Sequence, residues 1–194
     1  AYKCKGFIYD DGGEGNYGAL KQIALKLIVP GADSVRLRFL VLDYEKGFDS
    51  VVLFKTDTKQ VNKIGKFTGN TLPFGGSWIT VKTGVLWLIQ YSDPLVEGKG
   101  FKIQFEGKRK PITLDLGLDS TICMGDTVLV VPQVGNGYSP DLLYRWNTGA
   151  YTPDIVVKPN SAMRVALKLT DACTNVTVAD SMMVYVRKPL KITL

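Results

Sequence analysis

Residues 35–54 read VRLRFLVLDYEKGFDSVVLF, and this stretch sets the expected fold class. In its first part apolar and polar side chains alternate, which places Val35, Leu37, Phe39 and Val41 on one face of a half-buried strand. A short polar turn follows, and a second apolar run occupies residues 51–54. The stretch therefore predicts two consecutive β-strands joined by a short turn that carries acidic residues.

The rest of the chain repeats this pattern of short strands. The longest helix candidate, residues 17–29, has apolar residues with a period of two, so no stretch shows a sustained helical period. Further strands are expected at 78–81, 86–91 and 101–105, and then at 113–116, 127–131, 142–146, 155–157, 164–169 and 181–186. Short strands separated by Gly and Pro turns predict an all-β chain of two β-sandwich domains in tandem.

The composition changes after Glu106, where residues 107–111 read GKRKP. We expect a first domain at residues 1–106, a solvated linker at 107–112 and a second domain at 113–187. The text of residues 109–114 nearly recurs at 187–194. Residues 188–194 are therefore expected to begin a following domain or linker, and the chain is interpreted as a fragment of a longer modular protein.

The 194 residues contain no histidine. This excludes His-dependent nucleophilic catalysis and His-ligated zinc or haem. The net charge of +6 is shared equally by the two halves, so a basic nucleic-acid-binding face is not expected. No apolar run approaches the roughly 20 residues of a membrane-spanning helix. We expect a monomer without enzyme activity.

Four acidic residues surround the turns of the first half. Asp43, Glu45 and Asp49 flank the Lys46-Gly47 turn, and Asp93 follows a predicted strand. Convergent carboxylates repel one another unless a hard cation neutralises them, and Ca²⁺ prefers such oxygen ligands. From spacing alone, ordinary loop carboxylates remain the favoured interpretation, with a calcium site as the alternative.

The first half resembles a CUB domain, a β-sandwich module of extracellular proteins. The matching text is FLVLDYE at residues 39–45, FDSVVLF at 48–54, GKFTG at 65–69, LP at 72–73, YSD at 91–93 and GKGFKI at 98–103, covering about residues 4–106. The resemblance implies a jelly-roll sandwich in which Glu45, Asp49 and Asp93 hold Ca²⁺. It also implies a ligand from the Leu95 carbonyl, with Tyr17 and Asp43 supporting the cluster. The two disulfides usual in that family are absent, since this half contains only Cys4.

Cys123 and Cys173 flank predicted strands of the second half, with Trp146 between them. By themselves they are either a disulfide, which would indicate an oxidising compartment, or two buried thiols. This half resembles the PKD-like or immunoglobulin-like modules of large secreted proteins from Bacteroidetes, through DSTICMGDT at 119–127, YRWNTG at 144–149 and TDACTN at 170–175. The resemblance implies the Cys123–Cys173 disulfide and export by the type IX secretion route. Because Trp146 lies on a predicted strand between the two cysteines, we expect a core side chain packed on that disulfide, with a ligand-binding platform as the alternative.

Together these features predict a non-enzymatic adhesion or binding module of a secreted or cell-surface protein. Its ligand would be a protein or glycan on another surface, bound through a Lys or Arg of the partner. One alternative is an accessory segment of a secreted hydrolase, either a protease or a glycosidase. Another is a carbohydrate-binding module using exposed Trp78 or Trp87, although both tryptophans are expected to lie in the core.

Overall fold

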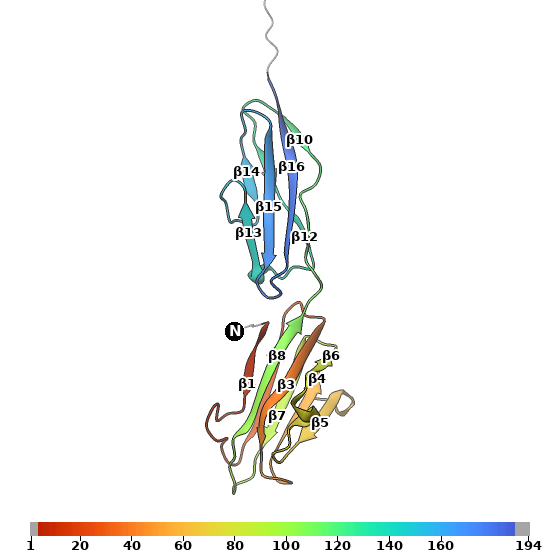
Figure 1. The fold of residues 1–194 in the computed structure, drawn as a ribbon, viewed down its shortest axis with the longest axis vertical. Coiled ribbons are helices and arrows are strands. Elements are labelled where there is room, and N and C mark those ends of the chain that lie inside the picture. Colours follow the sequence, from red (N-terminus) through yellow and green to blue (C-terminus); the bar gives the residue numbers. More distant parts are fainter. Residues whose placement is uncertain (1–3, 189–194) are drawn as a thin grey trace, which may run out of the picture. The chain divides into compact units, whose positions relative to one another are not determined.

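The computed structural model describes residues 4–188, and its secondary structure is β throughout apart from short 3₁₀ turns (Figure 1). These turns lie at Gln60–Asn62, Pro73–Gly76 and Ser139–Asp141. The chain divides into two compact units, residues 1–110 and residues 111–194. The all-β prediction with two sandwiches is confirmed, and among the described residues no helix could span a membrane.

The first unit contains two four-stranded antiparallel sheets. One has the order β1-β8-β3-β6, formed by Lys5–Tyr9, Gly100–Lys108, Ser34–Asp43 and Ile79–Val81. The other has the order β2-β7-β4-β5, formed by Gln22–Ile28, Val85–Tyr91, Ser50–Lys55 and Lys63–Phe67. The segment that was the longest helix candidate thus supplies strand β2, as its period of two indicates.

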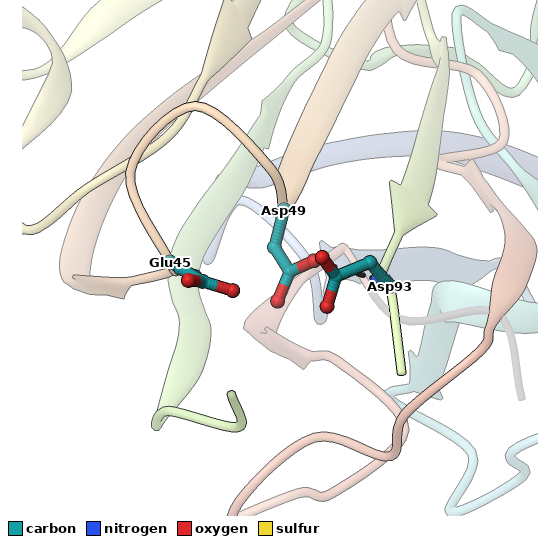
Figure 2. Close-up of side chains that lie close together, drawn as sticks. All are labelled: Glu45, Asp49 and Asp93. Carbon is teal, nitrogen blue, oxygen red and sulfur yellow. Dashed lines mark hydrogen bonds between the residues drawn. The ribbon is translucent and has the colours of Figure 1, made fainter. Parts of the chain in front are cut away.

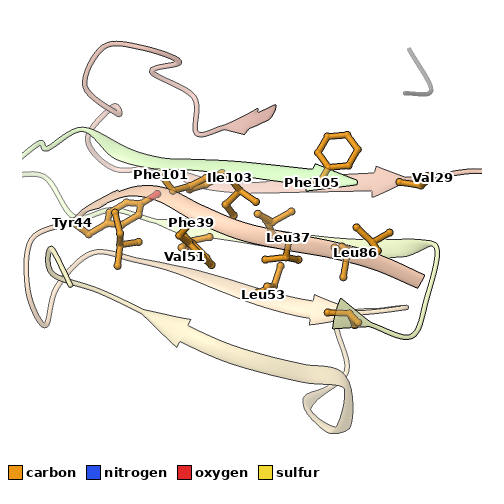
Figure 3. Close-up of a cluster of buried hydrophobic side chains, with 14 of the residues drawn as sticks. Val29, Leu37, Phe39, Tyr44, Val51, Leu53, Leu86, Phe101, Ile103 and Phe105 are labelled. Carbon is orange, nitrogen blue, oxygen red and sulfur yellow. The ribbon is translucent and has the colours of Figure 1, made fainter. Parts of the chain in front are cut away.

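Both sheets contribute to one apolar core, which Figure 3 shows between them. On β8, Phe101, Ile103 and Phe105 are at most 4% exposed, as their alternation predicts. Leu53 of β4 and Leu86 of β7 come from the other sheet and are at most 1% exposed. Burying such side chains contributes about 1.5–3 kcal/mol each, so this core is the main stabilising feature of the unit.

Strand β3 departs from its predicted alternation at Leu40. The register between β3 and β8 shifts between Phe39 and Val41, which marks a β-bulge. The extra residue, Leu40, is exposed, and Leu42 takes the core position that was predicted for Val41. The prediction for Val41 is wrong because a bulge changes which face each later residue occupies.

The predicted core positions of Trp78 and Trp87 are also wrong. On β7 the neighbouring Leu86 faces the core, so Trp87 lies on the outer face and is only partly buried. Trp78 precedes β6 and lies between Arg36 and Arg38, whose guanidinium carbons are 4.7 and 4.8 Å from its ring centroid. Lys26 Nζ lies 5.1 Å from the Trp87 ring centroid, so both rings pack against long cationic side chains.

The second unit has one four-stranded sheet and two short ladders. The large sheet has the order β10-β16-β15-β13, formed by Ser120–Cys123, Thr177–Arg187, Met163–Asp171 and Leu142–Trp146. The ladders pair β11 with β14, at Val128–Val130 and Ile155–Val157, and β12 with β9, at Gln133–Gly135 and Thr113–Asp115. Strand β10 runs parallel to β16, and the other pairs are antiparallel.

Trp146 lies in the core of this unit, where it is 2% exposed and its Nε1 donates a hydrogen bond to the Thr152 carbonyl at 2.8 Å. The predicted disulfide beside it is wrong. Cys123 ends β10 opposite Arg187, the last residue of β16, whereas Cys173 lies before the first residue of that strand. The 11 extended residues of β16 separate the two thiols by roughly 30 Å, a distance that no disulfide can bridge.

Several residues of the expected linker at 107–112 belong to a strand or are buried. Strand β8 continues to Lys108, and Arg109 is 9% exposed with its Nε bonded to the Pro30 carbonyl at 2.9 Å. Ile112 is 2% exposed in the second core. The basic run is therefore not simply a solvated stretch, because the stem of Arg109 is packed. The predicted start of a further domain falls largely on residues 189–194, outside the described residues.

Candidate metal centre

Pairing between β4 and β7 brings two of the predicted acids to one edge of the sheet. Ser50, the first residue of β4, lies opposite Tyr91, the last residue of β7. Asp49 therefore precedes one strand where Asp93 follows the other. The backbone N–H of Asp93 donates to Asp49 Oδ1 at 2.7 Å, which fixes the two loops to each other.

Glu45 reaches the same place through the turn between β3 and β4. The backbone N–H of Asp49 donates to the Glu45 carbonyl at 3.0 Å, and Gly47 has a φ of 92°, which favours glycine. Thr68, beyond β5, braces this turn: its Oγ1 donates to the Glu45 carbonyl at 3.1 Å and accepts from the Gly47 N–H at 3.0 Å. The sequence thus closes a tight turn that presents Glu45 to Asp49.

Tyr17 joins this cluster from the segment before β2. Its side chain is fully buried, and its hydroxyl donates to Asp49 Oδ2 and accepts from the Glu45 N–H at 3.3 Å. Its oxygen also lies 3.0 Å from the Val96 carbonyl. Burial, followed by the hydrogen bond to Asp49, raises the pKa of Tyr17, so the group is a neutral donor at physiological pH.

The three carboxylates point toward one another (Figure 2). Glu45, Asp49 and Asp93 each offer one oxygen, and these oxygens all lie within 4.8 Å of one another. Asp49 is 1% exposed, and Glu45 Oε2 is buried without a hydrogen-bond partner. Loss of solvation, and then the charges of Asp93 and Asp49, raise the pKa of Glu45. The site therefore holds three carboxylates close together, and one Glu45 oxygen there has no hydrogen-bond donor.

These features fit a hard cation. Oxygens that share one Ca²⁺ lie about 2.3–2.6 Å from it, so two of them can be at most about 5 Å apart. The spacing of the three carboxylates meets this limit. Glu45 Oε2 is buried without a hydrogen-bond partner, and a bound cation would supply the contact that this oxygen lacks. Because the groups that surround the site offer oxygen atoms, from carboxylates, hydroxyls and backbone carbonyls, the donor set favours Ca²⁺ or Mg²⁺ over a transition metal.

Two other predicted site residues lie beside the cluster. Asp43 Oδ2 accepts from the Lys99 N–H at 2.9 Å, so this carboxylate ties two loops together and is not among the three converging acids. The Leu95 N–H donates to Asp93 Oδ1 at 2.9 Å, while the Leu95 side chain is 78% exposed. Both residues hold the loops around the site.

Two supporting residues were missed from the sequence. Thr68 lies in the GKFTG segment and braces the Glu45 turn, as described above. Asp10 is 7% exposed and accepts from the Phe101 N–H at 2.7 Å and the Gly12 N–H at 2.8 Å. Desolvation raises the pKa of Asp10. The signal for Asp10 is the DDGG run at residues 10–13, typical of a side chain that bonds its own turn.

No family profile matches this chain, and no curated protein matches it. Solved structures similar to it include the CUB1-EGF-CUB2 domains of rat MASP-1, at 18% identity and a TM-score of 0.45, covering 55% of this chain and 41% of that one. The MASP-1 CUB2 domain bound to Ca²⁺ is 16% identical with a TM-score of 0.47, covering 54% and 94%. The full extracellular region of zebrafish Gpr126/Adgrg6 is 14% identical with a TM-score of 0.47, covering 86% and 24%.

Proposed function

We propose that the first unit is a non-enzymatic binding module of an extracellular or cell-surface protein, with loops ordered by Ca²⁺. The convergence of Glu45, Asp49 and Asp93 carries this proposal. The second unit would be a PKD-like or immunoglobulin-like spacer that presents the module. The sequence resemblance supports the wider setting, a CUB-like domain within a large adhesin-like bacterial protein exported by the type IX route.

The residues of the chain prepare the site before any ion arrives. Tyr17 holds one oxygen of Asp49, and the Asp93 backbone holds the other. The Thr68-braced turn fixes Glu45. Glu45, Asp49 and Asp93 would hold the ion, which when bound supplies positive charge that offsets their mutual repulsion. Ordering of three loops by one ion is the expected structural consequence.

The surface around the acids suits a basic residue with apolar neighbours. Leu20, which precedes β2, and Phe48 and Leu95, on loops that carry the acids, are 73%, 66% and 78% exposed. A pocket of about 320 Å³ beside Asp93 is lined in part by Leu20, Phe48 and Tyr91. A Lys or Arg of a partner would donate charge-assisted hydrogen bonds to carboxylate oxygens while apolar groups cover the rim.

Calcium titration calorimetry tests the metal site. The full chain should bind one Ca²⁺ with a Kd of about 10⁻⁴–10⁻³ M, the range of extracellular modules. Glu45→Gln should weaken binding at least about tenfold, as expected when a charged ligand is lost. Asp33→Asn is the matched control, since Asp33 is an exposed acid of the same unit outside the cluster. Equal effects of both variants would refute the site.

Peptide binding tests the partner surface. The immobilised probe is a synthetic peptide with one Lys flanked by Leu residues, compared with its acetyl-lysine counterpart. We expect binding in Ca²⁺, and loss of binding on chelation, on acetylation or in Glu45→Gln. Phe48→Ser should weaken binding without changing calcium affinity, because Phe48 lies on the rim. Peptide binding that persists after chelation, or is indifferent to acetylation, would contradict the proposal.

A further inference from the structure

The outer face of the large sheet of the second unit contains a cationic trough. Its pocket of about 430 Å³ has a floor of small side chains, Ala166, Ala179 and Ser181. The walls include three long basic side chains, Arg145, Arg164 and Lys168. These side chains come from β13 and β15, and the floor is completed by β16. The volume lies in the range of ordinary ligand pockets.

Among the described residues, no ion pair joins Arg145, Arg164 or Lys168 to an acidic side chain. The Arg164 guanidinium donates an Nη2–H to Ser181 Oγ at 3.0 Å. Asp180 also lines the pocket, but its carboxylate is engaged: Oδ2 accepts from the Leu116 N–H at 2.8 Å and Oδ1 from the Ser181 N–H at 2.7 Å. The trough therefore has a net positive charge.

The strand register places two of these charges directly opposite each other. Arg145 of β13 pairs with Lys168 of β15, and both side chains are exposed. Like charges at directly opposite positions of an antiparallel pair are destabilising. Arg164 lies four residues along β15, roughly 13 Å from Lys168 at the rise of a strand. The charges are thus arranged for anions at two separate points.

A second pocket of about 410 Å³ continues the trough, because Arg145 and Lys168 line both. Its lining adds Leu143, Tyr151 and Thr170. Tyr151 is 71% exposed, so its ring is available for contact with a ligand. The continuous surface therefore combines cations with hydroxyl groups and the exposed aromatic ring of Tyr151.

We propose that this trough binds an acidic glycan, a chain of sugars that carry carboxylate groups. Arg145, Lys168 and Arg164 would donate charge-assisted hydrogen bonds to the carboxylates. Ser181 and Thr170 offer hydroxyls to sugar hydroxyls, and the Tyr151 ring offers an apolar face to a sugar ring. This site is independent of the acidic cluster of the first unit, so either proposal can fail alone.

An acidic peptide fits the same surface less well. Extended peptides are bound to sheets by adding a strand at an open edge, where backbone groups supply much of the affinity. The trough instead crosses the face of the sheet, and β15 at its centre is paired on both sides, with β13 and with β16. Side chains alone face the ligand there.

Titration of the full chain with tetragalacturonate, followed by calorimetry and amide chemical shifts, tests the proposal. Its fully methyl-esterified form is the neutral control, and tetraglutamate is the peptide control. We expect saturable binding with shifts at residues 145, 166, 168 and 181, and at least about tenfold weaker binding of the ester. Arg145→Gln should also weaken binding about tenfold, because one charge-assisted contact is lost.

Lys158→Gln is the matched variant, since Lys158 is an exposed cation of the same unit outside the trough. Its affinity for tetragalacturonate should be unchanged, and Tyr151→Ala should weaken binding at constant charge. Lack of binding at millimolar tetragalacturonate would overturn the proposal. Equal binding of tetraglutamate, or equal loss in Lys158→Gln and Arg145→Gln, would overturn it too.

Discussion

Removing one oxygen atom, in Tyr17→Phe, should destabilise the first unit. The Tyr17 hydroxyl donates to the Asp49 carboxylate and contacts backbone groups of Glu45 and Val96, so it connects three loops. Without it, Asp49, which is 1% exposed, keeps the Asp93 N–H as a donor and loses the other. A hydrogen bond to a charged group contributes about 1.5–3 kcal/mol to the free energy of unfolding.

Calorimetric melting of the full chain measures this loss. For a unit of this size, about 2 kcal/mol corresponds to a fall of roughly 8–16 °C in Tm. The transition of the second unit should not move, and Tyr151→Phe, an exposed tyrosine of that unit, should change neither transition. Because Tyr17 also orients Asp49, a proposed metal ligand, calcium affinity should fall about tenfold or more. An unchanged Tm of the first unit, or an equal fall in both units, would refute the role assigned to Tyr17.

Three further predictions follow from the structure. First, Ca²⁺ at 100 times its Kd should add about 2.7 kcal/mol to the stability of the first unit and nothing to the second, measured by calorimetry. Second, calcium affinity should be lower at about pH 5 than at about pH 7.5, because the raised pKa of Glu45 keeps a competing proton on it. In the metal-free chain, the stability that Glu45 contributes is present below the pKa of Glu45 in the unfolded chain and is lost as pH rises through its raised pKa in the folded chain. Equal calcium affinity at the two pH values would contradict the raised pKa on which both expectations depend. Third, a reductant should leave the Tm of the second unit unchanged, since Cys123 and Cys173 lie at opposite ends of β16; a fall equivalent to about 2–4 kcal/mol would indicate a disulfide.

Alternation of apolar residues predicted the fold class, and the inward faces of β8 and the first half of β3 follow from it. It could not predict the bulge at Leu40, because an added residue costs little locally and is fixed by pairing with β8. Nor did it place Trp87, since a large aromatic residue on a strand fits either face. In the structure Leu86 faces the core, so Trp87 lies on the opposite face of β7, where its ring contacts Lys26.

The convergence of Glu45, Asp49 and Asp93 could be predicted as a hypothesis but not from spacing alone. It depends on β4 and β7 being neighbours, a pairing between segments about 40 residues apart in sequence. The hydrogen bonds from Thr68 to the Glu45 turn could not be predicted either, because they join residues more than 20 positions apart in sequence. The disulfide between Cys123 and Cys173 was predicted wrongly because the positions of cysteines along a chain do not show how far apart the fold places them. Here Cys123 lies beside the last residue of β16, and Cys173 precedes its first residue.

A crystal structure of the full chain grown in millimolar Ca²⁺, with anomalous scattering measured for the ion, would show directly whether the three carboxylates form a calcium site. We expect one ion bonded to an oxygen of each of Glu45, Asp49 and Asp93 at about 2.3–2.6 Å. We also expect the Tyr17 hydroxyl still to donate to Asp49. No ion between the three carboxylates, or an ion bound at another place in the chain, would refute the proposed site.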